Sequence, residues 1–265
     1  MLRLISAGLV LFACGIAQAN AQSPGHAADA AYPMRFTWQQ EGPPQTCGQD
    51  CRTWISAVGY VTGDTPQEFE QFARDPRVRG AVMVLDSDGG SVLGTLTLGR
   101  VIRGLDMVTT VGRTEVLPPA AEASGQYAKL SPESHCESMC AFLLLAGSRR
   151  FVPPQARVLV HQIWLGQKRK TALESSYSAE ELNVVQRDIG RLAQYTVEMG
   201  GSIELLETAL QVPPWEPLHL LSSDEIERMR LSTVEGVFAE VAPRTRPSVA
   251  AGALVTVGQP TSTGD

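Results

Sequence analysis

The chain has 265 residues, of which 43% are hydrophobic, and a formal net charge of −6. This length and composition suit one large domain with flanking segments. Because the net charge is negative and no long basic run occurs, nucleic acid is not expected as a partner. The short basic patch Gln167–Lys170 is interpreted as a solvated loop.

The first 21 residues are predicted to be a secretory signal peptide. Arg3 supplies the positive start, a short apolar run follows, and small-x-small cleavage sites end at Ala19 and Ala21. The apolar run is too short for a transmembrane helix, and no later stretch is long enough to form one. A lipoprotein signal ending at Cys14 is the alternative. We therefore expect an exported protein, periplasmic or secreted, that is cut near Ala21.

The chain is expected to consist of an arm over residues 22–52, a folded domain over 53–242 and a disordered tail over 243–265. Strands are predicted at 54–61, 80–85, 107–111, 151–152, 158–163 and 234–241, and helices are predicted to begin at 65 and 91 and to cover 138–146, 178–199, 203–210 and 223–229. Alternating strands and helices predict an α/β fold with a mainly parallel sheet. Residues 113–134 are predicted to be a long loop, either a lid or a tolerated insertion.

Four cysteines follow the signal segment: Cys47, Cys51, Cys136 and Cys140. In an exported protein such a set usually forms two disulfides, and the sequence leaves all three pairings open. Each Cys-x-x-x-Cys spacing would need a distorted turn to form a local bridge, because a regular helix aims these side chains poorly. Zinc is the rival interpretation. Its ligand pairs more often have two intervening residues, so disulfides are favoured and no metal is expected.

Three blocks of sequence supply the parts that nucleophilic acyl transfer needs. Asp86–Ser91 is a glycine turn able to bind an oxyanion, Cys136–Phe142 contains a serine that opens a helix, and Arg157–Gln162 contains a histidine that ends a strand. Each block alone is a weak signal. Their combination in this order indicates a serine hydrolase.

These blocks resemble the proteolytic subunit of the Clp protease, which belongs to the ClpP/crotonase superfamily. The resemblance covers about 54–240, and the Cys-x-Ser-x-Cys form is similar to periplasmic ClpP-like proteins. It implies a parallel sheet in a β-β-α superhelix with flanking helices, a peptide or protein substrate, and no cofactor. Because the relatives assemble into rings, the resemblance also allows a homo-oligomer.

Carried over position by position, the resemblance makes Ser138 the nucleophile and His161 the general base. The backbone N–H of Met139, together with that of Gly89 or Gly90, would form the oxyanion hole. This assignment is physically coherent, because the start of a helix leaves N–H groups without intrahelical partners. Glycine also lets the backbone approach a substrate carbonyl closely.

The chain departs from the family pattern at two positions. The acid of the family triad aligns with Leu218, which cannot orient an imidazole. Glu216 lies two residues earlier and can serve only if the loop shifts, whereas Asp224 is expected to help start a helix. Asp88 stands where the family usually has proline, and it is expected to weaken the oxyanion site by adding negative charge there.

The leading hypothesis is an exported serine peptidase that cleaves unfolded or short peptides without ATP-driven partners. The alternative is a binding or assembly module that has kept the fold and lost the acid, for which Leu218 is the evidence. Crotonase-like acyl-thioester chemistry is weaker, because export removes the protein from coenzyme A. A lysine-base mechanism is weaker still, because Lys129 has no positional match in that class.

Overall fold

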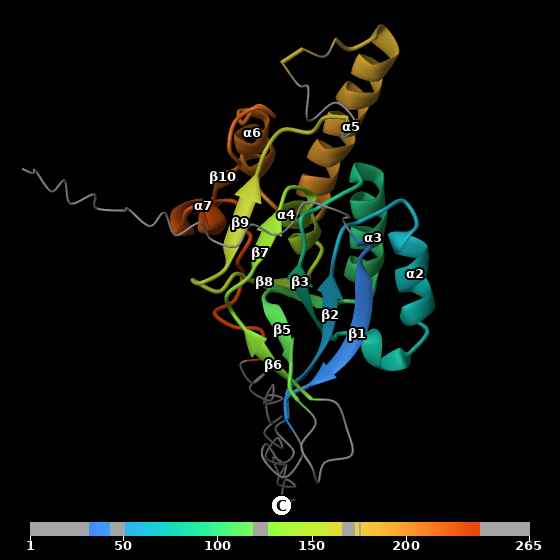
Figure 1. The fold of residues 1–265 in the computed structure, drawn as a ribbon, viewed down its shortest axis with the longest axis vertical. Coiled ribbons are helices and arrows are strands. Elements are labelled where there is room, and N and C mark those ends of the chain that lie inside the picture. The colour runs from blue at the N-terminus through green and yellow to red at the C-terminus, as the bar shows by residue number, and fades with distance from the viewer. Residues whose placement is uncertain (1–31, 43–50, 119–126, 166–172, 175, 239–265) are drawn as a thin grey trace, which may run out of the picture. The chain divides into compact units, whose positions relative to one another are not determined.

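The computed structural model of the chain describes residues 32–42, 51–118, 127–165, 173–174 and 176–238 (Figure 1). The chain divides into two compact units, Met1–Tyr32 and Pro33–Asp265, and the elements described below all belong to the second unit. The expected signal peptide, the basic patch, the tail, Cys14 and Cys47 lie outside the described residues.

A five-stranded sheet has the strand order β1-β2-β3-β4-β8. Its strands are β1 (Arg35–Gln40), β2 (Thr53–Val58), β3 (Val82–Asp86), β4 (Val108–Val111) and β8 (Arg149–Phe151). The edge strand β1 is antiparallel to β2, and the other three pairs are parallel. The apolar run that predicted a strand before the glycine turn forms the buried strand β3. The predicted mainly parallel α/β class is therefore confirmed.

A second sheet of three short strands carries the candidate site. It has the order β10-β9-β7, with β7 (His135–Glu137), β9 (Arg157–Val160) and β10 (His219–Leu220). β7 and β9 are parallel, and β10 is antiparallel to β9. A single bridge between Ser87 and Cys136 joins the segment after β3 to β7. This bridge brings the glycine turn beside the serine segment.

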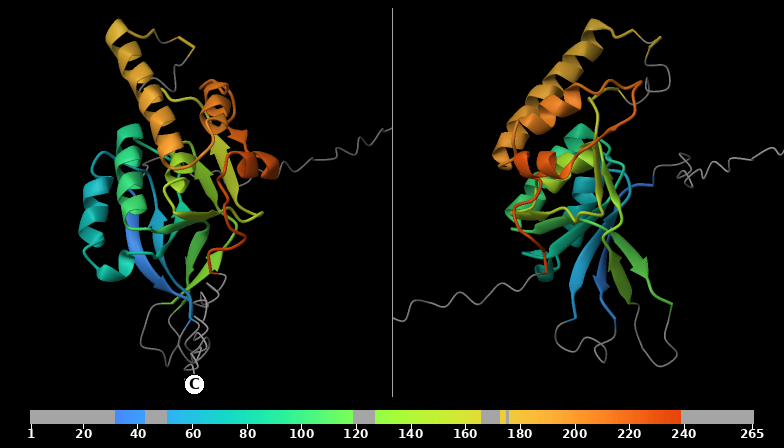
Figure 2. Two further views of the ribbon diagram at one scale, coloured as in Figure 1. Left: turned by 180° about the vertical axis from the view of Figure 1, so that it is seen from behind. Right: turned by 90° about the vertical axis from the view of Figure 1, so that its left-hand side faces the viewer.

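The helices surround these sheets. They are α2 (Thr65–Phe72), α3 (Val92–Gly104), α4 (Met139–Leu144), α5 (Ala179–Glu198), α6 (Glu204–Leu210) and α7 (Ser223–Arg228), with a 3-10 turn at Pro76–Val78. α2 and α3 contact each other beside the five-stranded sheet (Figure 1). α5 begins at the predicted capping box of Ser178 and Glu181. Its later turns contact α3, whereas its first turns project beyond the sheets (Figure 2).

Every residue of α4 is buried, and two arginines hold the chain just beyond its end. Arg103 donates hydrogen bonds to the carbonyls of Leu145 at 2.7 Å and Gly147 at 2.9 Å. Arg150 donates to the same two carbonyls at 3.0 and 3.2 Å. Both guanidinium groups also reach the carbonyl of Met199, at 3.1 and 2.9 Å, at the end of α5. Burial lowers the pKa of Arg150 to about 10, so this side chain stays charged at neutral pH.

The structure corrects three sequence predictions. Residues 35–40, expected within the arm, form β1, whose aromatic side chains pack against α2. The expected loop 113–134 contains the hairpin of β5 (Arg113–Val116) and β6 (Ala128–Ser131). No strand forms over the described part of 234–241, because Val234 is bound to the carbonyl of Arg150 in an irregular segment. None of the helices within the described ranges is long and apolar enough to cross a membrane.

Candidate active site

Ser138 occupies a strained turn between β7 and α4. Its backbone angles are φ 55° and ψ −120°, a region that side chains with a Cβ rarely adopt. Such a conformation costs on the order of 1–3 kcal/mol and persists only where the surroundings impose it. Ser138 makes no side-chain hydrogen bond to cap α4, so the ordinary role of a serine at this position does not apply. A strained strand-to-helix turn is also the place where α/β-hydrolases present their nucleophilic serine.

A disulfide between Cys136 and Cys140 encloses this turn. The two sulfurs are 2.03 Å apart, both residues are fully buried, and the Cα atoms are 5.1 Å apart. The prediction that a local bridge needs a distorted turn is confirmed, because Ser138 supplies the distortion. Cys51 is also disulfide-bonded. Since the thiols of Cys136 and Cys140 are joined to each other, the zinc interpretation of these two residues is wrong.

Gly89 lies against the serine turn so closely that no side chain would fit. A Cβ there would come within 2.7 Å of the Glu137 carbonyl oxygen, 2.8 Å of the Met139 nitrogen and 2.9 Å of the Ser138 Cβ. Its φ of 93° also favours glycine. The glycine turn and the start of α4 therefore form one continuous backbone surface around Ser138.

The two glycines of this turn differ in the N–H groups that they offer. Gly89 N–H donates to the Ser87 hydroxyl at 3.1 Å. The bridge between Gly90 and Val61 uses the Gly89 carbonyl and the Ser91 N–H, which leaves the N–H of Gly90 without a hydrogen bond among the described residues. Met139 is the first residue of α4, so its N–H has no intrahelical partner. Gly90 and Met139 are therefore the better-suited pair of oxyanion donors.

His161 directly follows β9, as Ser138 directly follows β7. Because β7 and β9 are parallel neighbours with Glu137 opposite Leu159, both residues lie at the same edge of the sheet. The imidazole Nδ1 is 2.7 Å from the Gln162 carbonyl oxygen. A carbonyl can only accept, so Nδ1 must carry the proton and Nε2 is the basic nitrogen of the neutral ring. A main-chain carbonyl thus favours the same tautomer that the acid selects in serine hydrolases with a complete triad.

Leu218, which aligns with the acid of the family triad, lies opposite His161 in the fold. His219 pairs with Val160 in the β9–β10 register, so one further step places Leu218 opposite His161. Glu216 is exposed in a turn where its N–H bonds to the Pro213 carbonyl. Within the described part of the chain, no hydrogen bond or ion pair joins Glu216 to His161.

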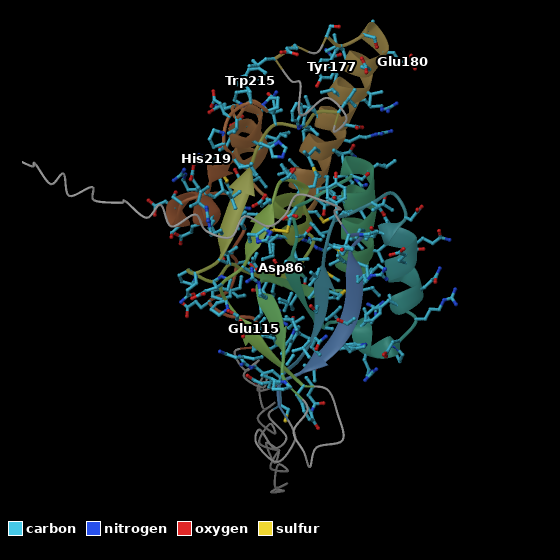
Figure 3. The ribbon with its side chains drawn as sticks, in the orientation of Figure 1. Asp86, Glu115, Tyr177, Glu180, Trp215 and His219 are labelled. Carbon is cyan, nitrogen blue, oxygen red and sulfur yellow. A yellow bond between two sulfur atoms is a disulfide. The ribbon has the colours of Figure 1, made fainter. Side chains whose placement is uncertain are left out.

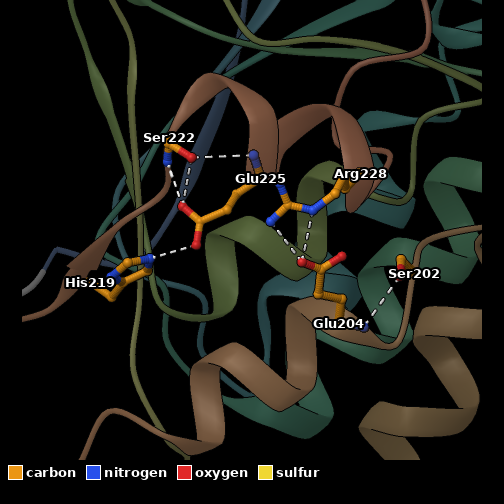
Figure 4. Close-up of polar contacts among 6 residues, drawn as sticks. All are labelled: Ser202, Glu204, His219, Ser222, Glu225 and Arg228. Atoms are coloured by element: carbon orange, nitrogen blue, oxygen red, sulfur yellow. Dashed lines mark hydrogen bonds and ion pairs between the residues drawn. The ribbon is translucent and has the colours of Figure 1, made fainter.

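The carboxylate of Glu225, which lies beside β10, caps the helix α7. Glu225 accepts hydrogen bonds from the Ser222 N–H at 2.7 Å and from His219 Nε2 at 2.9 Å (Figure 4). Burial alone would raise the pKa of Glu225, but the hydrogen bonds from Ser222 and His219 outweigh it and lower the pKa. Asp224 stands in the first turn of α7, as expected. These contacts fix the start of α7.

A polar cluster beside the glycine turn was not predicted. His135 Nε2 lies 2.7 Å from Asp88 Oδ1, and its Nδ1 lies 3.7 Å from Asp86 Oδ1. Asp86, labelled in Figure 3, is held by the Ser134 hydroxyl at 2.7 Å and by Arg113 at 3.5 Å. The hydrogen bond to Asp88, with the charges of Asp86 and Glu137, raises the pKa of His135. Asp88 therefore has a partner for its negative charge beside the oxyanion site.

Comparison with protein families agrees with this geometry. Residues 135–211 match the Clp protease family. The matched segment starts at β7, contains both Ser138 and His161, and ends just after α6. A search of curated proteins found no match. This segment of the chain is therefore similar to a Clp protease domain.

Proposed function

We propose that this protein is an exported ClpP-like serine peptidase whose domain adopts the β-β-α superhelix of the ClpP/crotonase superfamily. The observation that carries the proposal is the strained backbone turn at Ser138. Gly89 packs closely against this turn, and the N–H of Met139, the next residue, has no partner within the helix. The family match over residues 135–211 supports the same assignment.

In the proposed reaction the Ser138 hydroxyl oxygen attacks the carbonyl carbon of a peptide bond. His161 Nε2 takes the hydroxyl proton, and the N–H groups of Gly90 and Met139 bind the oxyanion that forms. His161 then donates that proton to the departing amine, and the acyl group remains on Ser138. A water molecule gives a proton to His161 and attacks the ester, the bond between the acyl carbon and the Ser138 oxygen breaks, and His161 returns the proton to that oxygen as the acid leaves. No step consumes ATP.

The place of Leu218 opposite His161 sets the expected rate. A serine and histidine that keep the oxyanion hole retain part of the catalysis when the acid is absent. The Gln162 carbonyl supplies the tautomer selection but not the negative charge that stabilises an imidazolium. We therefore expect a slow peptidase acting on short or unfolded peptides, with Glu216 contributing only if its loop moves.

Export is part of the proposal. The segment up to Ala21 has the pattern of a secretory signal, and disulfides form mainly in oxidising compartments. The bonded pair Cys136–Cys140 and the bonded Cys51 support such a compartment. The ATP-driven unfoldases that serve the cytosolic relatives have no ATP outside the cell membrane, so we propose that this protein acts without them.

A fluorophosphonate probe, which acylates activated serines, tests the proposal on the folded, oxidised protein. We expect the probe on Ser138 by mass mapping, and loss of labelling in Ser138→Ala and His161→Ala. Ser148→Ala is the matched control, because Ser148 is exposed and lies after α4, and this variant should label normally. Absence of label on Ser138 in correctly folded protein contradicts the proposal.

A second candidate function is a peptide-binding module without catalysis, and Leu218 in the place of the acid favours it. The same experiment separates the two candidates. The module predicts no labelling of Ser138, together with peptide binding that Ser138→Ala leaves unchanged. The peptidase predicts labelling that disappears in this variant.

A further inference from the structure

We infer that Asp88, His135 and Glu137 form a binding site for a divalent transition-metal ion of the Zn²⁺ class. One ligand atom from each residue lies within 4.8 Å of the other two. This inference replaces the expectation from the sequence that the protein has no metal site. It stands independently of whether Ser138 is a nucleophile.

The backbone fixes the three ligands relative to one another. His135 and Glu137 are two residues apart on β7, so their side chains leave the strand on the same face. The Glu137 N–H donates to the Ser87 carbonyl at 2.9 Å, and the Ser87 N–H donates to the His135 carbonyl at 3.4 Å. These bonds hold Asp88, the next residue after Ser87, alongside the other two ligands.

The surroundings of His135 match those of a metal-binding histidine. Metal-bound histidines usually face a carboxylate or carbonyl with their second nitrogen, which orients the ring and makes it a better ligand. Here Nδ1 faces Asp86 at 3.7 Å, while Nε2 points to Asp88. Asp86 is largely buried and is held in turn by Ser134 and Arg113. The ring therefore already presents Nε2 to the ligand side.

The donor set selects the class of ion. One imidazole nitrogen with two carboxylate oxygens suits Zn²⁺ and similar ions, whereas Ca²⁺ and Mg²⁺ prefer oxygen ligands alone. Zinc bonds of about 2.0–2.2 Å place tetrahedral ligand atoms roughly 3.3–3.6 Å apart. The 2.7 Å contact between His135 and Asp88 would have to open slightly, and Glu137 would approach. Three protein ligands leave the fourth position for water or a substrate group.

The metal site shares its backbone with the oxyanion turn. Ser138 follows Glu137 directly, and Gly89 follows Asp88 directly. An ion held by Asp88 and Glu137 therefore joins the same two segments that meet at Gly89 and Ser138. The site is in a position to change the reactivity of Ser138 by binding or releasing its ion.

Calorimetric titration of the metal-free, oxidised full-length protein with ZnCl₂ at neutral pH tests this inference. We expect one Zn²⁺ per chain at this site, and at least a tenfold weaker affinity in Asp88→Asn/Glu137→Gln. The matched control is Asp224→Asn/Glu180→Gln, two exposed carboxylates at the starts of α7 and α5. It should bind zinc as the unaltered protein does. Thermal unfolding of each variant checks that the fold is intact.

Cobalt gives a second readout that depends on ligand identity. Co²⁺ bound to the unaltered protein should show the visible absorption of a four-coordinate site, and His135→Gln should lose it. His219→Gln should keep it, because His219 lies on β10 and pairs with Glu225 instead. Equal zinc affinity in the carboxylate variant and the unaltered protein, or a cobalt spectrum that persists in His135→Gln, overturns the inference.

Discussion

The main-chain N–H of Ser138 donates a hydrogen bond of 2.8 Å to the carbonyl of Leu159. Leu159 stands two residues before His161, so this single bond ties the serine turn to the strand that carries the histidine. The candidate nucleophile and base are therefore positioned by backbone pairing between β7 and β9.

Restoring an acid opposite His161 should raise activity. Leu218→Asp places a carboxylate next to the imidazole across the β9–β10 pair, where it stabilises the imidazolium that forms during attack. We expect at least about a tenfold faster reaction of Ser138 with a fluorophosphonate, since removing the acid's charge from a complete triad costs about 10⁴. Leu218→Asn introduces a side chain of the same size as aspartate but without its charge, and it should not accelerate labelling. Equal rates for the two variants would contradict the placement of residue 218 as the position of the acid for His161.

A methyl group at Gly89 should slow the reaction strongly. Gly89→Ala puts a Cβ within 2.9 Å of three backbone and side-chain atoms of the serine turn, so this turn or the glycine turn must move. The Cβ would lie 2.8 Å from the Met139 nitrogen and displace this oxyanion donor. Losing one oxyanion donor typically costs about 10²–10³ in rate, and we expect a loss of this order in peptide hydrolysis. Gly63→Ala is the control, because a Cβ there meets nothing within 4 Å. Normal hydrolysis by Gly89→Ala would argue against the oxyanion assignment.

Removing the disulfide around Ser138 should affect both stability and reactivity. Cys136→Ala/Cys140→Ala releases a short loop, which the chain-entropy model values at about 2 kcal/mol of the free energy of unfolding. We also expect slower labelling of Ser138, because the bridge encloses the residue whose backbone is strained. Urea unfolding and probe kinetics measure the two effects separately. Labelling at an unchanged rate would mean that the turn keeps its conformation without the bridge.

The Glu225 carboxylate should stabilise the fold only in its ionised form. Its pKa is lowered from the ordinary value of 4.5, so the stabilisation is complete above pH 4.5 and is lost as the pH falls through the lower value of the folded state. Glu225→Gln should therefore lower the free energy of unfolding by about 1 kcal/mol at pH 7, the usual value of a helix cap. The difference should vanish in acid.

Chemical denaturation at a series of pH values measures this effect. Glu227→Gln is the control, because Glu227 is exposed in the same helix and should unfold like the unaltered protein at every pH. A difference between Glu225→Gln and the unaltered protein that persists unchanged into acid contradicts the assigned role.

The sequence predicted those parts of the fold whose patterns are long. β3, α3 and α5 have apolar runs, helical spacing or a capping box, and all three form near the expected residues. β7 and β10 have three and two residues, too few for any periodicity to appear. β1 was missed although Phe36 and Trp38 alternate with polar residues, because the surrounding composition resembled a linker.

The candidate site also has parts that the sequence predicted and parts that it did not. The closeness of Gly89 to Ser138 followed from a resemblance that carried the geometry of a known family. The contact between Asp88 and His135 joins residues 47 positions apart, and no local pattern reports such a contact. The alternation of His135 and Glu137 was the one available signal, since it places both on one face of any strand. This alternation indicates a shared face only when residues 135–137 are known to form a strand.

The guanidinium groups of Arg103 and Arg150 hold the chain after α4 by hydrogen bonds, in addition to the apolar packing of the helix itself. Both side chains also donate hydrogen bonds to the carbonyl of Met199, and these bonds connect the C-terminal end of α4 to the last turn of α5. Burial lowers the pKa of Arg150 to about 10, so its guanidinium group keeps its charge and its hydrogen bonds at neutral pH. The helix that follows Ser138 therefore has its C-terminal end held to the last turn of α5, which ties the placement of the candidate nucleophile to the packing of α5.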